Sequence, residues 1–202
     1  MECPFCDHKI LTKEKITENN HFYLAPAKGS FLPYYFLIIS HAHQRAIGSF
    51  LNEPKVYNQF IEIKTETEKF IKKKNYRNYI CFEHGASYDD KGGCCVEHAH
   101  FHILPFNIPL RKKIESHLGK ATVLKNYKEL GFQVKDNPSY LLLEENKKIY
   151  FWKQPLIISQ YMRRLIANEL LIKEKFDWKR FPFWSLMKKS IKEWQSHHRR
   201  QK

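Results

Sequence analysis

Three histidines alternate with apolar residues along one short segment, residues 98–104 (His-Ala-His-Phe-His-Ile-Leu). Side chains of a β-strand point alternately to its two faces, so a strand over residues 96–104 would align His98, His100 and His102 on one face. A row of imidazoles is not needed for packing. It fits either metal chelation or nucleophilic catalysis, in which one imidazole attacks and its neighbours set its tautomer and position.

The residues before the histidines favour catalysis. Gly92-Gly93 allows a tight turn whose backbone N–H groups approach an anion, as a phosphate cradle requires. Glu97 would face away from the imidazoles, where a metallohydrolase would use a carboxylate.

A second chemical pattern lies at the N-terminus, where Cys3 and Cys6 are separated by two residues. Two thiolates at this spacing, completed by two imidazoles, can hold a tetrahedral Zn²⁺. Redox chemistry is the alternative, but a redox pair is expected where a helix starts after a strand. We therefore favour zinc.

Together these motifs resemble the histidine triad (HIT) superfamily of nucleotide hydrolases and transferases. Residues 98–104 resemble its triad signature, residues 37–43 (Leu-Ile-Ile-Ser-His-Ala-His) resemble a strand end of the family, and residues 3–6 resemble the cysteine pair of its zinc-binding members. The resemblance covers residues 1–108. It implies an α+β fold, in which helices cover one face of an antiparallel sheet, and a homodimer.

The resemblance also assigns roles. His100 would attack an α-phosphate and form a covalent nucleotidyl-histidine, with His98 and His102 in support. The related transferases carry Gln at the third position, so His102 favours hydrolysis. A structural zinc would bind Cys3, Cys6, His43 and His98, with His8 and His41 as fallback ligands.

Phosphate contacts would come from the segments around the glycines. Gly93 and Cys95 would meet the phosphate, although a thiol is a weaker donor than the family's usual hydroxyl. Glu83 would place a carboxylate near the phosphate, where the two negative charges repel each other. His84 would then contact the phosphate instead. Ala27 replaces the family's usual ribose-binding residue.

The elements that must position these residues can be predicted from patterning. We expect strands over residues 21–26, 34–40 and 79–83 and one amphipathic helix from Val56 to Phe70 whose Lys64 is solvated. Beyond residue 108 we expect helix over 108–130, a hairpin of 139–144 with 148–152, a helix capped by Ser159 that runs to about Leu171, and a last helix over 184–194.

The chain of 202 residues has a formal net charge of +14. Counted on the printed sequence, residues 1–108 carry 13 basic and 12 acidic side chains, and residues 109–202 carry 22 and 9. We therefore predict a triad domain over 1–108 and a basic, α-rich extension over 109–202. In the extension, the segment that contains Gln160, Arg163 and Arg164 would either close over a phosphate or carboxylate through its two arginines or form a solvated basic helix face.

These observations predict a nucleotide hydrolase that acts on a small nucleotide or nucleotidyl conjugate. Two alternatives remain: processing or binding of nucleic-acid ends through the basic extension, and a nucleotide sensor without turnover. No apolar run approaches the length of a membrane span, and no signal sequence is present, so we expect a cytoplasmic protein.

Overall fold

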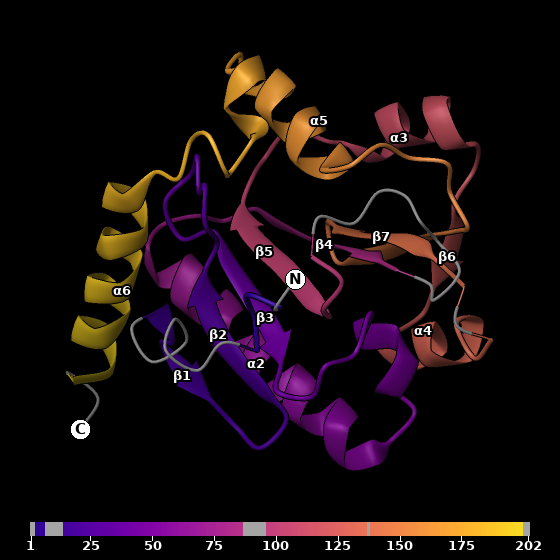
Figure 1. The fold of residues 1–202 in the computed structure, drawn as a ribbon, viewed down its shortest axis with the longest axis horizontal. Helices are drawn as coiled ribbons and strands as arrows, with labels where there is room; N and C mark the ends of the chain where they lie inside the picture. Colours follow the sequence, from indigo (N-terminus) through magenta and orange to yellow (C-terminus); the bar gives the residue numbers. More distant parts are fainter. Residues whose placement is uncertain (1–2, 7–13, 87–95, 137, 200–202) are drawn as a thin grey trace.

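The computed structural model describes residues 3–6, 14–86, 96–136 and 138–199. Its strands form a single antiparallel sheet in the order β1-β2-β3-β5-β4-β7-β8-β6 (Figure 1). The strands are β1 (Thr17–Glu18), β2 (Phe22–Pro26), β3 (Phe36–Ser40), β4 (Tyr79–Gly85), β5 (His100–Pro105), β6 (Thr122–Leu124), β7 (Tyr140–Glu145) and β8 (Lys148–Lys153). This sheet with its helices confirms the predicted antiparallel α+β fold.

Five α-helices and two 3₁₀ turns accompany the sheet in the described ranges. They are η1 (Ile47–Phe50), α2 (Pro54–Lys73), α3 (Arg111–Leu118), α4 (Tyr127–Gln133), α5 (Tyr161–Glu169), η2 (Lys173–Phe176) and α6 (Trp184–Arg199). None of these helices combines the length and apolarity that crossing a bilayer would need.

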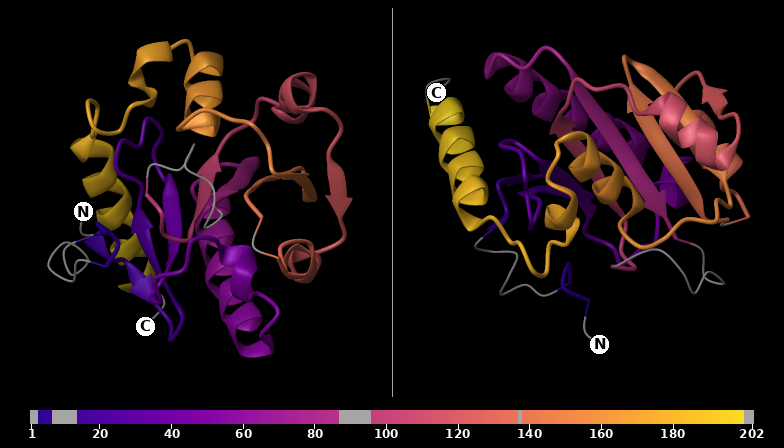
Figure 2. Two further views of the ribbon diagram at one scale, coloured as in Figure 1. Left: turned by 45° about the vertical axis from the view of Figure 1, so that its right-hand side comes forward. Right: turned by 90° about the horizontal axis from the view of Figure 1, so that it is seen from above.

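Two hydrophobic cores lie on opposite faces of the sheet. One contains Phe60 of α2, Tyr127 of α4 and Trp194 of α6, and the other contains Ile114 of α3 and Met162 of α5. Both views of Figure 2 show α2 on one side of the sheet and α3 with α5 on the other. The structure thus adds helices from the second half to both faces.

Helix α2 forms where the periodicity predicts it, because Val56, Phe60, Ile63 and Phe70 are buried along one stripe. The expectation for Lys64 is wrong. This residue is buried, and its ammonium lies 2.8 Å from a Glu144 carboxylate oxygen and also pairs with Glu68.

The second half is less helical than predicted. Residues 108–130 contain strand β6 between α3 and α4 rather than continuous helix. The predicted hairpin is present as β7 and β8, and its turn residues Asn146 and Lys147 have φ of 52° and 62°, as a two-residue type I′ loop requires. Because three strands of this half join the same sheet, the boundary at residue 108 falls within one continuous sheet.

Two helix ends also need correction. Ser159 does not cap α5, which begins after Gln160, a left-handed residue with φ of 60° and no side-chain capping bond. Helix α6 runs to Arg199, beyond the predicted end at Trp194.

Candidate active site and metal cluster

The three histidines do not share one strand. Strand β5 begins at His100, so His98 precedes it, and the predicted strand start at Val96 is wrong. His100 pairs with Ile39 of β3, while His102 lies between Leu37 of β3 and Phe82 of β4. His100 and His102 therefore share a sheet face, and the His98 ring is free to turn toward the N-terminal segment.

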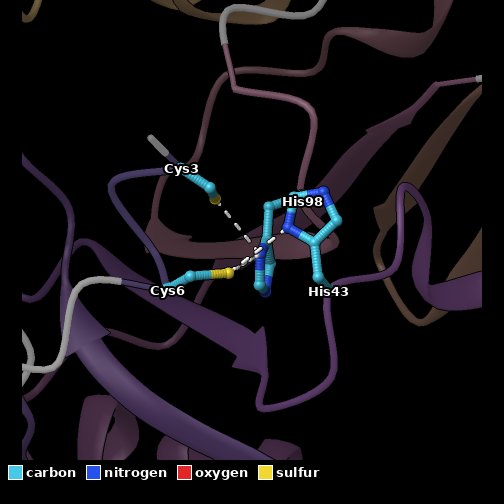
Figure 3. Close-up of side chains that lie close together, drawn as sticks. All are labelled: Cys3, Cys6, His43 and His98. Atoms are coloured by element: carbon cyan, nitrogen blue, oxygen red, sulfur yellow. Dashed lines mark hydrogen bonds between the residues drawn. The ribbon is translucent and has the colours of Figure 1, made fainter. Parts of the chain in front are cut away.

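His98 and three other predicted ligands form one cluster, shown in Figure 3. One ligand atom from each of Cys3, Cys6, His43 and His98 lies within 4.8 Å of all the others. The His98 Nδ1 atom is 3.4 Å from Cys3 Sγ and 3.5 Å from Cys6 Sγ, and His43 Nδ1 is 3.3 Å from Cys6 Sγ. A tetrahedral Zn²⁺ with ordinary bond lengths separates its sulfur and nitrogen ligands by roughly 3.5 Å, so these residues fit that ion.

The backbone prepares His98 as a ligand. Its Nε2 atom lies 2.8 Å from the Ser40 carbonyl oxygen and donates to it, which leaves the Nδ1 lone pair directed at the thiols. Burial lowers the pKa of His98, which favours the neutral ligand form. The fallback ligand His41 instead contacts the Asn19 carbonyl, and His8 lies outside the described residues.

A second cluster of metal-ligating residue types, Glu68, Cys81 and Glu144, lies on the opposite face beneath α2. There the ammonium of Lys64 pairs with both carboxylates. The cluster thus carries its own cation.

His100 is held so that one ring nitrogen is available to react. Its Nδ1 atom lies 2.6 Å from the His98 carbonyl oxygen, to which it donates, and Nε2 is therefore the unprotonated nitrogen. Burial lowers the pKa of His100 to about 4, so the ring is neutral at neutral pH. A neutral imidazole with a free Nε2 lone pair can act as a nucleophile.

His100 and His102 line a cleft to which both halves of the chain contribute. The cleft holds ≈ 1090 Å³ of space, open solvent at its mouth included. Phe5, Ala27 and His84 come from the first half, and Gln160, Tyr161, Met162, Arg163 and Trp178 come from the second. The N-terminal turn reaches the triad, because the Phe5 ring lies 5.3 Å from the His100 ring.

The predicted phosphate-binding residues separate into three groups. His84, Gln160 and Arg163 line the cleft. Gly93 and Cys95 lie outside the described residues. The prediction for Glu83 is wrong, because alternation along β4 places it on the face opposite the cleft, where it accepts hydrogen bonds from the Ile47 N–H and the Tyr140 hydroxyl.

Arg163 uses two of its donors within the protein. Its Nε donates to the Phe176 carbonyl at 2.8 Å and its Nη2 to the Gly29 carbonyl at 2.6 Å, so these donors serve the protein itself. Gln160 differs, because its Oε1 atom is buried with no hydrogen-bond partner in the described part of the chain. A donor on a bound ligand would satisfy it.

Sequence patterns did not reveal three residues of the cleft region. Tyr35, within the predicted strand 34–40, resembles a core aromatic, and only its hydroxyl requires a partner. Phe5 lies between the two cysteines, so the metal motif carries it to the triad. Trp178 follows η2 in a segment without regular pattern, and no signal in the sequence identifies it.

The chain thus combines an antiparallel α+β fold with two neighbouring histidines in a cleft. Comparisons with known proteins identify this fold. No family model matches the sequence, and no curated protein matches it. Among solved structures, the chain resembles yeast Ap4A phosphorylase Apa2 at 12% identity, over 87% of this chain and 80% of that one, with a TM-score of 0.51.

Two further similar structures are a histidine triad protein from Clostridium difficile (22% identity, 54% of this chain, 96% of that chain, TM-score 0.38) and the same yeast enzyme in complex with Ap4A (13%, 73%, 62%, TM-score 0.47). The likeness to the phosphorylase over most of both chains shows that this chain has a histidine-triad-like fold. The predicted fold is therefore confirmed.

Proposed function

We propose that this protein is a nucleotide hydrolase that cleaves its substrate at the α-phosphate through a covalent intermediate on His100. The Nε2 lone pair of His100 attacks the phosphorus, and the bond to the leaving group breaks with its electron pair. Water then attacks the same phosphorus and releases His100, so that one displacement becomes two.

The hydrogen bond from His100 Nδ1 to the His98 carbonyl is the observation that carries this proposal. It fixes the tautomer and aims the reactive nitrogen, which is the task of the orienting group in nucleophilic catalysis. Support comes from the yeast enzyme whose fold this chain shares, since that enzyme is a phosphorylase of the nucleotide Ap4A.

The proposal includes a structural Zn²⁺ held by Cys3, Cys6, His43 and His98. Bound there, the ion would tie the N-terminal turn to His98, two residues before the start of β5. Phe5 would then be fixed against His100, and the ion would take no part in the reaction itself.

Incubation with dinucleoside polyphosphates and nucleoside phosphoramidates tests the function. We expect release of mononucleotide, and mass spectrometry of a rapidly quenched reaction should find a nucleotidyl group on His100. His100→Ala should abolish both signals, whereas His197→Ala on α6 should leave them unchanged. Nucleotide binding without turnover or a trapped intermediate would instead establish the sensor alternative.

Several finer predictions accompany this proposal. Hydrolysis rather than transfer rests on His102, as the resemblance implies. A homodimer, a cytoplasmic location and nucleic-acid binding by residues 109–202 stay predictions of the sequence. An oligonucleotide that binds at about 100 mM salt, with an affinity that falls as salt rises, would support the last of these.

A further inference from the structure

A buried chain of three side chains connects helix α5 with the triad. From the geometry we infer that Arg163 and Tyr35 are positioning residues which hold His102 in the tautomer protonated at Nε2. The inference rests on the proposed function for its catalytic meaning, but the tautomer itself can be measured without any substrate.

The first step is the contact between Tyr35 and His102. The Tyr35 side chain is fully buried directly before β3, and its hydroxyl oxygen lies 2.8 Å from His102 Nδ1. A buried hydroxyl proton without an acceptor is costly, and His102 Nδ1 is the acceptor that the described structure offers to Tyr35. That proton is satisfied only if Tyr35 donates to His102 Nδ1.

Arg163 packs against the Tyr35 ring and holds it in place for this bond. Its guanidinium carbon lies 5.6 Å from the centre of the Tyr35 ring, so the positive charge packs against the ring that carries the hydroxyl. A guanidinium has donors and no acceptor, so it cannot take the Tyr35 proton away from His102 Nδ1. The Tyr35 proton is then directed to His102 Nδ1.

The position of Arg163 is itself fixed. The Gly29 and Phe176 carbonyls accept from Nη2 and Nε, and the guanidinium carbon lies 4.9 Å from the centre of the Phe31 ring. Because Arg163 belongs to α5, the second half of the chain completes the triad of its own protomer.

The tautomers of His102 and His100 determine which groups the two rings present to the cleft. When Nδ1 of His102 accepts, its proton must reside on Nε2, and the ring is held by stacking on Phe82 at 4.2 Å with an interplanar angle of 11°. His100 has the opposite arrangement, with its proton on Nδ1. The two neighbouring imidazoles therefore offer a lone pair from His100 and an N–H from His102, which are the groups needed to attack a phosphorus and to donate a hydrogen bond to a phosphate or leaving-group oxygen.

The direct test is imidazole nitrogen NMR of the full chain labelled with ¹⁵N-histidine. We expect wild-type His102 to show a protonated Nε2. Tyr35→Phe removes only the hydroxyl and should give a mixture of the two tautomers or a protonated Nδ1. Tyr34→Phe is the matched control, because the hydroxyl of that residue bonds Glu193 on α6. A wild-type His102 protonated at Nδ1, or a tautomer unchanged by Tyr35→Phe, would overturn the inference.

Kinetics supply the second measurement. Tyr35→Phe should lower kcat by about 10–100-fold with little change in KM, as losses of orienting partners do. Arg163→Lys keeps the positive charge but loses the planar guanidinium with its several donors. This variant should also lower kcat. If Tyr35→Phe fails to fold, the wild-type spectrum together with that of Arg163→Lys decides.

The two proposals fail in different ways. If His100→Ala retains full turnover, the proposed function fails, while the NMR result still decides the tautomer. If wild-type turnover requires His100 but Tyr35→Phe matches Tyr34→Phe in kcat, the positioning role is wrong and the proposed function stands.

Discussion

At the scale of single residues, burial and hydrogen bonding set the chemistry of each ionisable group. His100 and Glu83 show opposite outcomes of the same physics. Burial disfavours the charged form of both, which lowers the pKa of His100 to about 4 and raises that of Glu83 to about 7. The imidazole thereby stays neutral for attack, and the carboxyl is a structural group on the far face of the sheet.

The buried carboxyl of Glu83 gives a prediction for the pH dependence of stability. Its pKa is raised by burial, so its contribution to folding is fully present below about pH 4.5 and is lost as pH rises through about 7. Glu83→Gln should remove this dependence. We expect the free energy of unfolding of the wild type, relative to the variant, to fall by on the order of 2–3 kcal/mol between pH 5 and pH 8.

Urea denaturation at several pH values measures this difference. The exposed change Glu62→Gln on α2 is the control and should leave the pH dependence as in the wild type. Parallel curves for the wild type and Glu83→Gln would refute the assignment.

At the scale of elements, the sequence reveals what periodicity encodes and misses what tertiary contacts impose. The α2 stripe and the Asn146-Lys147 hairpin are predictable because local spacing and turn chemistry determine them. The start of β5 is not, because His98 bonds the Ser40 carbonyl and the two thiols outside the strand. Lys64 has the sequence context of a solvated lysine, and only the approach of Glu144 from β7 buries it.

The ion pairs of Lys64 give a prediction for the contact between α2 and β7. Lys64→Met would leave the half-buried carboxylate of Glu68 and the buried carboxylate of Glu144 without their cation. Removal of one partner from a buried pair is costly, so we expect a loss of about 3–5 kcal/mol in the free energy of unfolding. Lys69→Met on the exposed side of α2 should change stability by less than about 0.5 kcal/mol. Equal effects of the two substitutions would contradict the prediction.

Gly29 gives a second prediction, for the loop before β3. Its φ is +69°, and an added Cβ would lie 2.5 Å from Trp178 Cβ and 2.8 Å from Arg163 Nη2. Gly119 also has a positive φ, of +80°, but an added Cβ would meet no atom within 4 Å. Both alanine variants incur backbone strain of about 1–3 kcal/mol. Gly29→Ala alone must also displace Trp178, so its Tm should fall further than that of Gly119→Ala; a smaller fall would count against this packing.

At the scale of the whole molecule, the excess of basic residues in the second half does not mark a separate appendage. Strands β6, β7 and β8 extend the sheet of the first half, and α5 supplies part of the cleft. Charge counting along the sequence cannot detect this, because composition carries no information about strand pairing. The triad and the zinc motif were visible because short spacings encode them, whereas the contacts that join His102, Tyr35 and Arg163 link residues from the two halves of the chain.

Metal removal gives the prediction at this scale. Purified protein should contain about one zinc ion per chain, and Cys6→Ser should lower that content and the Tm. Cys81→Ala, which changes the buried thiol beneath α2, should keep the zinc content of the wild type. Elemental analysis beside thermal unfolding checks both, and retention of zinc by Cys6→Ser would disprove the assigned ligands.

The pairing of β4 with β7 has a consequence for how the chain avoids association. Residues 80–85 of β4 form a ladder with residues 140–145 of β7. Within the described ranges, the strands at the two sheet borders are the short Thr17–Glu18 and Thr122–Leu124. Short border strands offer little template for another chain. A fragment that ended near residue 108 would instead expose the backbone donors and acceptors of β4, and we expect it to aggregate or to pair with a second copy through that strand.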